Sequence, residues 1–250
     1  MKIAQIMLAK GFGGAERSFV DISHALRERG HEVLAICEAR GKTRGMLRGV
    51  RVIPITVRGH WDPLAQSKLK KILSAENPQI VHAHLARAAK LAGKVSAQLN
   101  IPSLVKTHNY VDLKYYQHVS CLVPTTNDQE QYLLANGVRS ERICRVPNFT
   151  AMNLLDTAPV FKPQEVVQFV AIGRFVQKKG FDLLIRALAS VARETAVALT
   201  LVGDGELHAA LQAQVNTAGL QGRVTFHGWS NDVAAILDKA DIFVLPSRDE

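Results

Sequence analysis

Short apolar segments rich in β-branched residues alternate along the chain with longer segments in which apolar residues recur three and four positions apart. The short segments have the length of buried strands, and the longer ones have the period of amphipathic helices. Lys2–Leu8 predicts the first strand and Ala15–Arg29 the first helix, which Gly30 closes. Alternation of this kind is typical of repeated β-α-β units, so we expect parallel sheets covered by helices.

Residues 1–148 are expected to form one Rossmann-like domain with six or seven strands. Asp62 and Pro63 supply an N-cap and a first-turn proline for a helix that reaches about Ser74. The other expected strands are His31–Cys37, Val50–Ile55, Gln79–His84, Ser103–Thr107 and Ser120–Thr125, and the other expected helices are Leu85–Gln98 and Asn127–Asn136.

The periodicity stops after Pro147, where prolines interrupt any regular element, and we interpret residues 149–165 as a linker. Residues 166–250 are expected to form a second Rossmann-like domain, the fold class being α/β with two parallel-sheet lobes. Its expected strands are Val166–Ile172, Val197–Val202, Arg223–His227 and Ile242–Leu245, and its expected helices are Gly180–Arg193, Glu206–Thr217 and Asp232–Asp238. A parallel sheet needs helices on both faces, but no helix is expected after the last strand of this lobe. The sequence therefore predicts that the second lobe is incomplete and the chain truncated.

Composition places the chain among ordinary globular proteins, with 47% hydrophobic and 21% charged residues. We find no apolar run near the roughly 18 to 20 residues that a membrane span requires. The first residues do not resemble a secretory signal, and the cysteines, Cys37, Cys121 and Cys144, are odd in number and far apart. The sequence therefore predicts a cytoplasmic protein.

The positive charge is concentrated in one half of the chain. Residues 1–150 carry 22 lysines and arginines against 11 aspartates and glutamates, whereas residues 151–250 carry 9 against 11. A basic surface attracts nucleic acid, anionic lipid or acidic substrates, and it can also serve only solubility. No aromatic platform accompanies the charge, which argues against nucleic acid as a partner.

Glycines follow the first expected strand, in the run Gly11-Phe12-Gly13-Gly14. Backbone N–H groups between a strand and a helix favour an anion, so this run predicts an anion-binding loop. Glu16 occupies the place of the third glycine of a dinucleotide fingerprint. Nicotinamide binding, with Glu38 on the ribose, stays an alternative, as does a simple turn.

A second candidate is the basic loop, residues 173–180, which lies between an expected strand and an expected helix. Cations at a helix N-terminus oppose the helix dipole unless an anion lies between them. The planar guanidinium of Arg174 and the ammonium of Lys179 would suit a diphosphate. A solvated loop is the alternative.

Histidines form a third group. Alternation along a strand places His82 and His84 on the same side, and His108 lies just after the next expected strand. All three can face one cleft, where a neutral histidine would hydrogen-bond a substrate hydroxyl or phosphate. Structural histidines and a zinc site are the alternatives, although no suitably spaced further ligand accompanies them.

The last candidates follow the strands of the second domain. Gly203, Gly228 and Trp229 lie where ligands of open α/β sheets bind, and we expect them to contact the same ligand as Arg174. Ordinary turn chemistry is the alternative.

Taken together, these segments resemble the family 4 (group 1) glycosyltransferases of the GT-B fold. The resemblance runs along nearly the whole chain and is carried by Gly13-Gly14-Ala15-Glu16-Arg17, Val81-His82-Ala83-His84, Thr107-His108, Pro147-Asn148, Gly173-Arg174 through Lys179-Gly180, Gly203-Asp204-Gly205 and Ala240-Asp241-Ile242-Phe243-Val244-Leu245-Pro246-Ser247. It implies an acceptor-binding first lobe and a second lobe that binds a nucleotide-diphosphate sugar.

By position, the resemblance implies that Arg174 and Lys179 neutralise the donor diphosphate and that His108 lies near the reacting centre. It implies donor contacts for Gly13 and Gly14 as well. Glu250 resembles the first glutamate of the family's carboxylate pair, which touches the transferred sugar. Arg17 and His84 are the expected acceptor-binding residues.

The implied reaction is metal-independent glycosyl transfer with retained anomeric configuration, and no cofactor is expected. The expected acceptor is a glycolipid or saccharide of bacterial lipopolysaccharide or another envelope glycan. We expect the basic lobe to dock on anionic lipid at the inner face of the cytoplasmic membrane. Two alternatives remain, a two-lobed module that binds a small ligand without chemistry and a nucleotide-sugar epimerase of the same fold.

Overall fold

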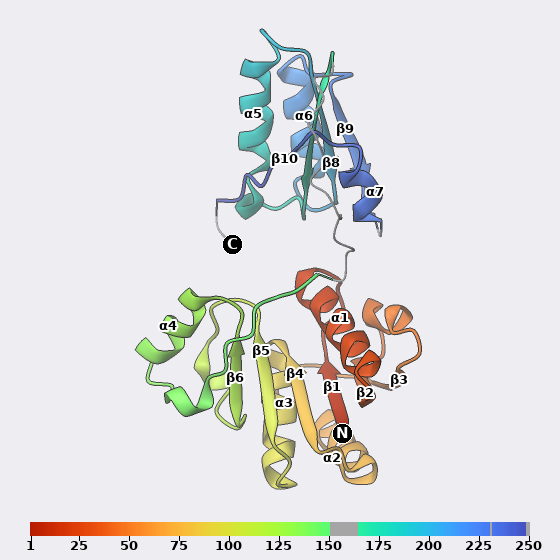
Figure 1. Ribbon diagram of the computed structural model, residues 1–250, viewed down its shortest axis with the longest axis vertical. Helices are drawn as coiled ribbons and strands as arrows, with labels where there is room; N and C mark the ends of the chain where they lie inside the picture. The colour runs from red at the N-terminus through yellow and green to blue at the C-terminus, as the bar shows by residue number, and fades with distance from the viewer. Residues whose placement is uncertain (151–164, 231, 249–250) are drawn as a thin grey trace. The chain divides into compact units, whose positions relative to one another are not determined.

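The computed structural model describes residues 1–150, 165–230 and 232–248. The chain divides into two compact units, Met1–Ala151 and Met152–Glu250, and each is described by itself (Figure 1). The linker expected at 149–165 lies almost entirely outside the described residues. No helix in the described ranges is both long and apolar enough to cross a membrane.

The first unit contains a six-stranded sheet in which all neighbouring strands are parallel. The strand order is β3-β2-β1-β4-β5-β6, so β1 and β4 are central neighbours (Figure 1). The strands are β1 (Lys2–Met7), β2 (Glu32–Glu38), β3 (Arg51–Ile55), β4 (Ile80–His84), β5 (Ser103–Thr107) and β6 (Cys121–Pro124). Their carboxyl ends therefore share one edge of the sheet.

Helices cover both faces of this sheet, because alternate strand residues point to opposite sides. Ile6 belongs to the core shared with α2 and α3, whereas Met7 packs with Phe19 of α1. The helices are α1 (Gly14–Glu28), α2 (Pro63–Glu76), α3 (Leu85–Gln98) and α4 (Asn127–Ala135), and the 3-10 turns are η1 (Lys42–Met46), η2 (Leu113–Tyr115) and η3 (Ser140–Arg142).

The second unit contains a four-stranded parallel sheet of order β10-β7-β8-β9. Helices α5 and α6 pack on its core, while Ile242 and Phe243 of β10 are 40% and 50% exposed. The strands are β7 (Val167–Ile172), β8 (Val197–Val202), β9 (Val224–Gly228) and β10 (Ile242–Phe243), the helices are α5 (Phe181–Val191), α6 (His208–Thr217) and α7 (Val233–Leu237), and η4 (Gln177–Lys179) is a 3-10 turn.

The sequence pattern predicts this α/β architecture correctly, and two local differences have physical causes. The helix expected from Gly180 begins at Phe181, because Gly180 takes a left-handed conformation (φ 65°) that separates α5 from the 3-10 turn before it. The strand expected over Ile242–Leu245 ends at Phe243, shortly before Pro246, which has no N–H for a further ladder bond.

Candidate active site

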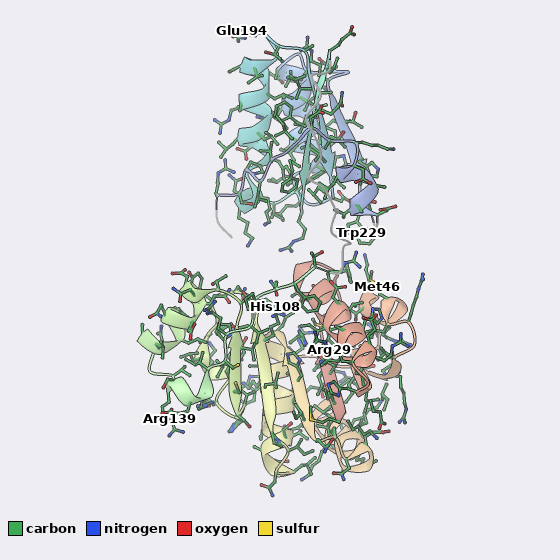
Figure 2. All side chains as sticks on the ribbon, viewed as in Figure 1. Arg29, Met46, His108, Arg139, Glu194 and Trp229 are labelled. Carbon is green, nitrogen blue, oxygen red and sulfur yellow. The ribbon has the colours of Figure 1, made fainter. Side chains whose placement is uncertain are left out.

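The carboxyl edge of the first sheet gathers the histidines singled out in the sequence. His82 and His84 are buried on β4, with ring centroids 4.3 Å apart, and His108 lies just after β5. The His108 ring stacks on that of His84, with centroids 5.6 Å apart. Figure 2 labels His108 at the carboxyl end of β5. The structure therefore brings the three residues together, with the His84 ring between those of His82 and His108.

Gln5 joins these rings into one hydrogen-bonded chain. It lies on β1 directly opposite His82 of β4, and its side chain is fully buried. The Gln5 amide nitrogen lies 3.1 Å from Nδ1 of His82, and its oxygen lies 3.0 Å from Nε2 of His84. Nδ1 of His84 then lies 3.3 Å from Nε2 of His108. We call His82, Gln5, His84 and His108 the histidine chain.

The Gln5 oxygen sets the direction of these hydrogen bonds. An amide oxygen can only accept, so Nε2 of His84 donates to it and Nδ1 of His84 is left as an acceptor. Nε2 of His108 therefore donates to His84, and the neutral His108 ring carries its lone pair on Nδ1. Both ring nitrogens of His84 are engaged within the chain, so its buried ring has none left for an acceptor substrate.

Burial keeps the histidine chain neutral. Burial, together with the smaller effect of nearby Lys106, lowers the pKa of His82 to about 3 and that of His108 to about 4. The pKa of His84 is also far below its usual value, mainly because its ring is buried. At neutral pH His108 is therefore a hydrogen-bond acceptor rather than a proton acceptor. Within the described residues, no three His, Cys, Asp or Glu side chains are grouped so as to hold a metal ion.

The glycine run after β1 leads into α1. Gly13 is its N-cap residue in an extended conformation, and no side chain of the described residues caps the helix. First-turn amides without such a cap can donate to an anion. Arg17 is exposed one turn into the helix. The hydroxyl of Ser18, the residue after this motif, lies 3.5 Å from the side-chain oxygen of Asn148.

In the second unit, the backbones at the carboxyl ends of β7, β8 and β9 approach one another closely at Gly173, Gly203 and Gly228. Gly173 donates to the Val202 carbonyl at 2.9 Å, and Gly203 donates to the Gly228 carbonyl at 2.8 Å. A Cβ on Gly203 would lie 1.9 Å from the Gly173 oxygen, and its φ of 135° is unfavourable for other residues. Only glycine fits at Gly203, and the edge is lined by backbone atoms.

The basic loop lies at this same edge. Arg174 is exposed, and the half-buried Lys179 folds back so that its Cδ lies 3.9 Å from the place of a Cβ on Gly173. Both cations therefore come from the loop that follows β7. Trp229, 55% exposed, follows β9, which is separated from β7 by β8, and Figure 2 labels it. Glu250 lies outside the described residues.

Arg248, which is distant in sequence from the basic loop, is hydrogen-bonded to it. Its guanidinium forms two hydrogen bonds to the Asp182 carboxylate, at 2.7 and 2.6 Å, and a third to the Gln177 carbonyl at 2.8 Å. The Arg248 amide donates to the Lys178 carbonyl at 2.7 Å. The pair lowers the pKa of Asp182. The segment after β10 thereby fixes the turn that carries Lys179.

The sequence analysis missed Gln5 and Arg248 as parts of the site. A signal exists for Gln5, because a glutamine in the middle of an apolar strand must find buried hydrogen-bond partners. Arg248 has no comparable signal, since charged residues are common in loops.

Comparisons with known proteins match both units of the chain to glycosyltransferases. Residues 12–152 match the family described as Glycosyltransferase Family 4, and residues 167–250 match Glycosyl transferases group 1. The chain is 32% identical over 260 residues to the lipopolysaccharide core biosynthesis glycosyltransferase LpsE of Rhizobium meliloti (strain 1021), covering 100% of this chain and 73% of that protein. It is 30% identical to LpsD of the same organism, covering 95% of this chain and 69% of the relative.

A solved structure shows the same fold. The crystal structure of Anabaena Alr3699/HepE in complex with UDP-glucose superimposes with a TM-score of 0.81 at 21% identity, covering 99% of this chain and 74% of that one. Because the family match spans more than half of the chain and LpsE is 32% identical to it, the protein is a member of glycosyltransferase family 4 with the GT-B fold, a family whose enzymes transfer sugars with retention of configuration.

Proposed function

We propose that this glycosyltransferase moves a sugar from a nucleoside-diphosphate donor to a hydroxyl of a lipopolysaccharide core acceptor. The relatives LpsE and LpsD, both named for lipopolysaccharide core biosynthesis, support the acceptor class. The HepE complex with UDP-glucose supports a nucleotide sugar as donor.

The observation that carries this proposal is the basic loop beside a glycine-lined sheet edge in the second unit. Arg174 and Lys179 follow β7, Gly203 follows the neighbouring β8, and Gly228 ends β9 beyond it, so neither glycine has a side chain that would exclude a ligand. Negative charge builds on the departing diphosphate as the sugar becomes oxocarbenium-like. Two cations aimed at that charge stabilise the transition state more than the ground state.

The remaining residues keep the roles that the family resemblance gives them, with one change. His108 acts near the reacting centre as a hydrogen-bond acceptor for a sugar hydroxyl, and His84 acts through His108 because its own nitrogens are engaged. Gly13 and Gly14 approach the donor with their backbone, and Trp229 lies along it. Arg17 binds the acceptor, and Glu250 touches the transferred sugar.

The first unit also docks on anionic lipid in this proposal, which would place the enzyme at the inner face of the cytoplasmic membrane. Trp61 and Leu64 are 82% and 72% exposed at the start of α2, and the same helix exposes Lys68, Lys70 and Lys71. Aromatic and aliphatic side chains beside lysines are the usual components of a membrane-interface anchor.

The proposed function is tested with Arg174→Ala and Lys179→Ala in the full-length protein. Each substitution should lower turnover and weaken UDP-sugar binding by about tenfold or more, because each removes a charge-assisted contact to the diphosphate. A panel of nucleotide sugars is assayed with and without a lipopolysaccharide core acceptor. Arg193→Ala, which removes an exposed arginine just after α5, is the matched control.

Unchanged kinetics in both basic-loop variants would reject their assignment. Consumption of the donor without an acceptor would indicate an epimerase, and binding of the free sugar as tightly as its nucleotide form would indicate a non-catalytic binding module.

A further inference from the structure

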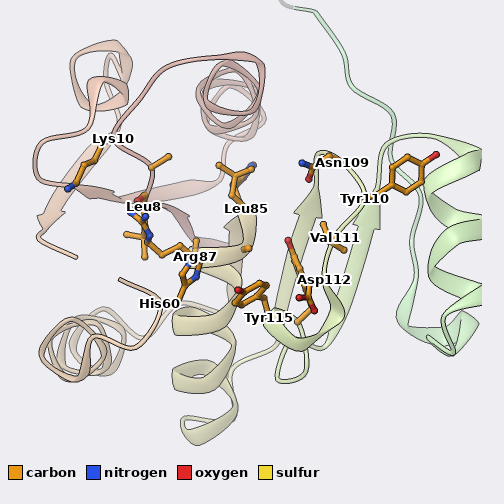
Figure 3. Close-up of a pocket in the computed structure, with 15 residues that line it drawn as sticks. Leu8, Lys10, His60, Leu85, Arg87, Asn109, Tyr110, Val111, Asp112 and Tyr115 are labelled. Carbon is orange, nitrogen blue, oxygen red and sulfur yellow. Dashed lines mark hydrogen bonds between the residues drawn. The ribbon is translucent and has the colours of Figure 1, made fainter. Parts of the chain in front are cut away.

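The first unit contains a cavity of about 460 Å³ that the residue roles above leave unassigned, apart from His84 in its wall (Figure 3). It lies where β1 and β4 end, and residues 109–116 close its other side. All of its lining comes from described residues of one unit. Its polar groups therefore all belong to the first unit.

The Arg87 guanidinium, which lines this cavity, has an N–H group without a hydrogen-bond partner among the described residues. Its Nη1 donates to the Leu8 carbonyl at 3.1 Å, which fixes the guanidinium against the end of β1. Its Nε is buried and has no hydrogen-bond partner among the described residues. A buried N–H without a partner costs free energy comparable to a lost hydrogen bond, so a ligand that accepts from Arg87 would bind with that gain.

His60 presents a second unpartnered group. Its ring stacks on Tyr115, with centroids 4.9 Å apart, and its Nδ1 is buried without a partner in the described part of the chain. Burial lowers its pKa, and the charges of Arg87 and Lys90 lower it further. The imidazole is therefore neutral and retains one N–H to donate, and Arg87, one of the two cations that act on it, lines the same cavity. Figure 3 shows His60 and Arg87 on the same side of the cavity.

The backbone adds positive potential. Helix α3 begins at Leu85 in the cavity wall, and no side chain in the described part of the chain caps it, so its first-turn amides and its dipole favour an anion. Lys10 contributes a further cation. Among the described residues that line the cavity, the only carboxylate is that of Asp112, which is already paired with Lys114.

We propose that this cavity binds an anionic group, a phosphate or a carboxylate, through Arg87, His60 and the α3 N-terminus. The proposal rests on the proposed function in one respect, that the anion is carried by the acceptor sugar. A guanidinium fork fits the oxygens of either group, and backbone amides complete the contact. The cavity thus selects acceptors that carry a negative charge near the sugar to be extended.

The test uses the full-length protein with nitrogen-15 label and follows the His60 ring and Arg87 Nε signals by NMR. Glucose 6-phosphate, glucuronate and glucose are titrated separately, so that the arms distinguish phosphate from carboxylate. At least one of the two anionic sugars should shift both signals with saturation, and neutral glucose should not. Because the NMR signals come from His60 and Arg87 themselves, a phosphate bound at the basic loop does not count as binding in this cavity. The same titration in an Arg174→Ala/Lys179→Ala background removes the basic-loop site altogether.

Matched variants on one helix sharpen the test. Arg87→Gln should weaken binding of the anionic sugar by about tenfold or more, whereas Lys94→Gln, which removes an exposed cation further along α3, should change it less than about twofold. Lys10→Gln, in an exposed loop, should weaken binding even if Arg87→Gln fails to fold.

Two results would overturn the inference, namely glucose binding as tightly as both anionic sugars, or Arg87→Gln and Lys10→Gln both matching Lys94→Gln. Turnover of nucleotide sugars is measured on the same samples, so a failure of the proposed transferase function is seen separately from a failure of the anion site.

Discussion

The side-chain oxygen of Gln5 lies 3.0 Å from Nε2 of His84, and this contact sets the tautomers along the histidine chain. The two residues are far apart in sequence but lie on neighbouring parallel strands. Because the amide oxygen can only accept, the neutral ring of His108 at the other end of the histidine chain carries its lone pair on Nδ1. Gln5 thereby acts on His108 without touching any substrate.

Gln5→Leu should destabilise the first unit and loosen His108. The substitution leaves Nε2 of His84 buried without a partner, which costs about 1–3 kcal/mol. Urea unfolding gives the free-energy change, and nitrogen-15 NMR of the imidazoles should show His108 losing its single tautomer. Gln98→Leu, at an exposed position on α3, is the control and should be nearly neutral. An unchanged His108 tautomer in Gln5→Leu would contradict the role given to Gln5.

Acid should destabilise the first unit well above the range in which carboxylates titrate. The pKa values of His82 and His108 are about 3 and 4 in the folded chain, whereas unfolded histidines titrate near 6.5. Between these values the unfolded state binds more protons, so the free energy of unfolding falls as the pH is lowered from 6.5 toward 4, by up to about 1.4 kcal/mol per pH unit for each proton.

Urea unfolding at pH 7, 6 and 5 measures this slope, with hydrogen exchange of β1 and β4 amides assigning it to the first unit. His108→Gln should reduce the slope, and His227→Gln, exposed in the second unit, should leave it unchanged. A stability that does not vary over this range would show that the histidines are not held neutral by burial.

Gly203→Ala should damage the second unit more than the matched Gly219→Ala. Both glycines have positive φ, but a Cβ on Gly203 would lie 1.9 Å from the Gly173 carbonyl, whereas one on Gly219 meets no atom within 4 Å. Gly219→Ala should therefore cost only about 1–2 kcal/mol of backbone strain, and Gly203→Ala should also separate β7 from β8. Thermal unfolding and UDP-sugar binding check this, and equal effects of the two substitutions would refute it.

Binding to vesicles should depend on both lipid charge and the start of α2. Trp61→Ala combined with Leu64→Ala should weaken sedimentation with phosphatidylglycerol vesicles by about tenfold or more, since two exposed apolar side chains can no longer enter the interface. Trp229→Ala, in the second unit, is the control. Added salt should weaken binding further. Binding that does not respond to the anionic lipid content would exclude electrostatic docking.

The sequence by itself determined the order and type of the elements. Strand and helix periods are local properties, and so are the N-cap of α2 at Asp62, the left-handed Gly30 after α1 and the basic loop after β7. Each is set by residues a few positions apart, which is why each could be predicted without coordinates.

Only the tertiary structure decided which polar groups meet. The hydrogen bond between Gln5 and His84 depends on the register between β1 and β4, and the hydrogen bonds of Arg248 to Asp182 join residues 66 positions apart. The unpartnered nitrogens of Arg87 and His60 are likewise visible only once the cavity around them is known. Hydrophobic period reports which face of an element is buried, whereas a hydrogen-bond partner depends on contacts between segments distant in sequence.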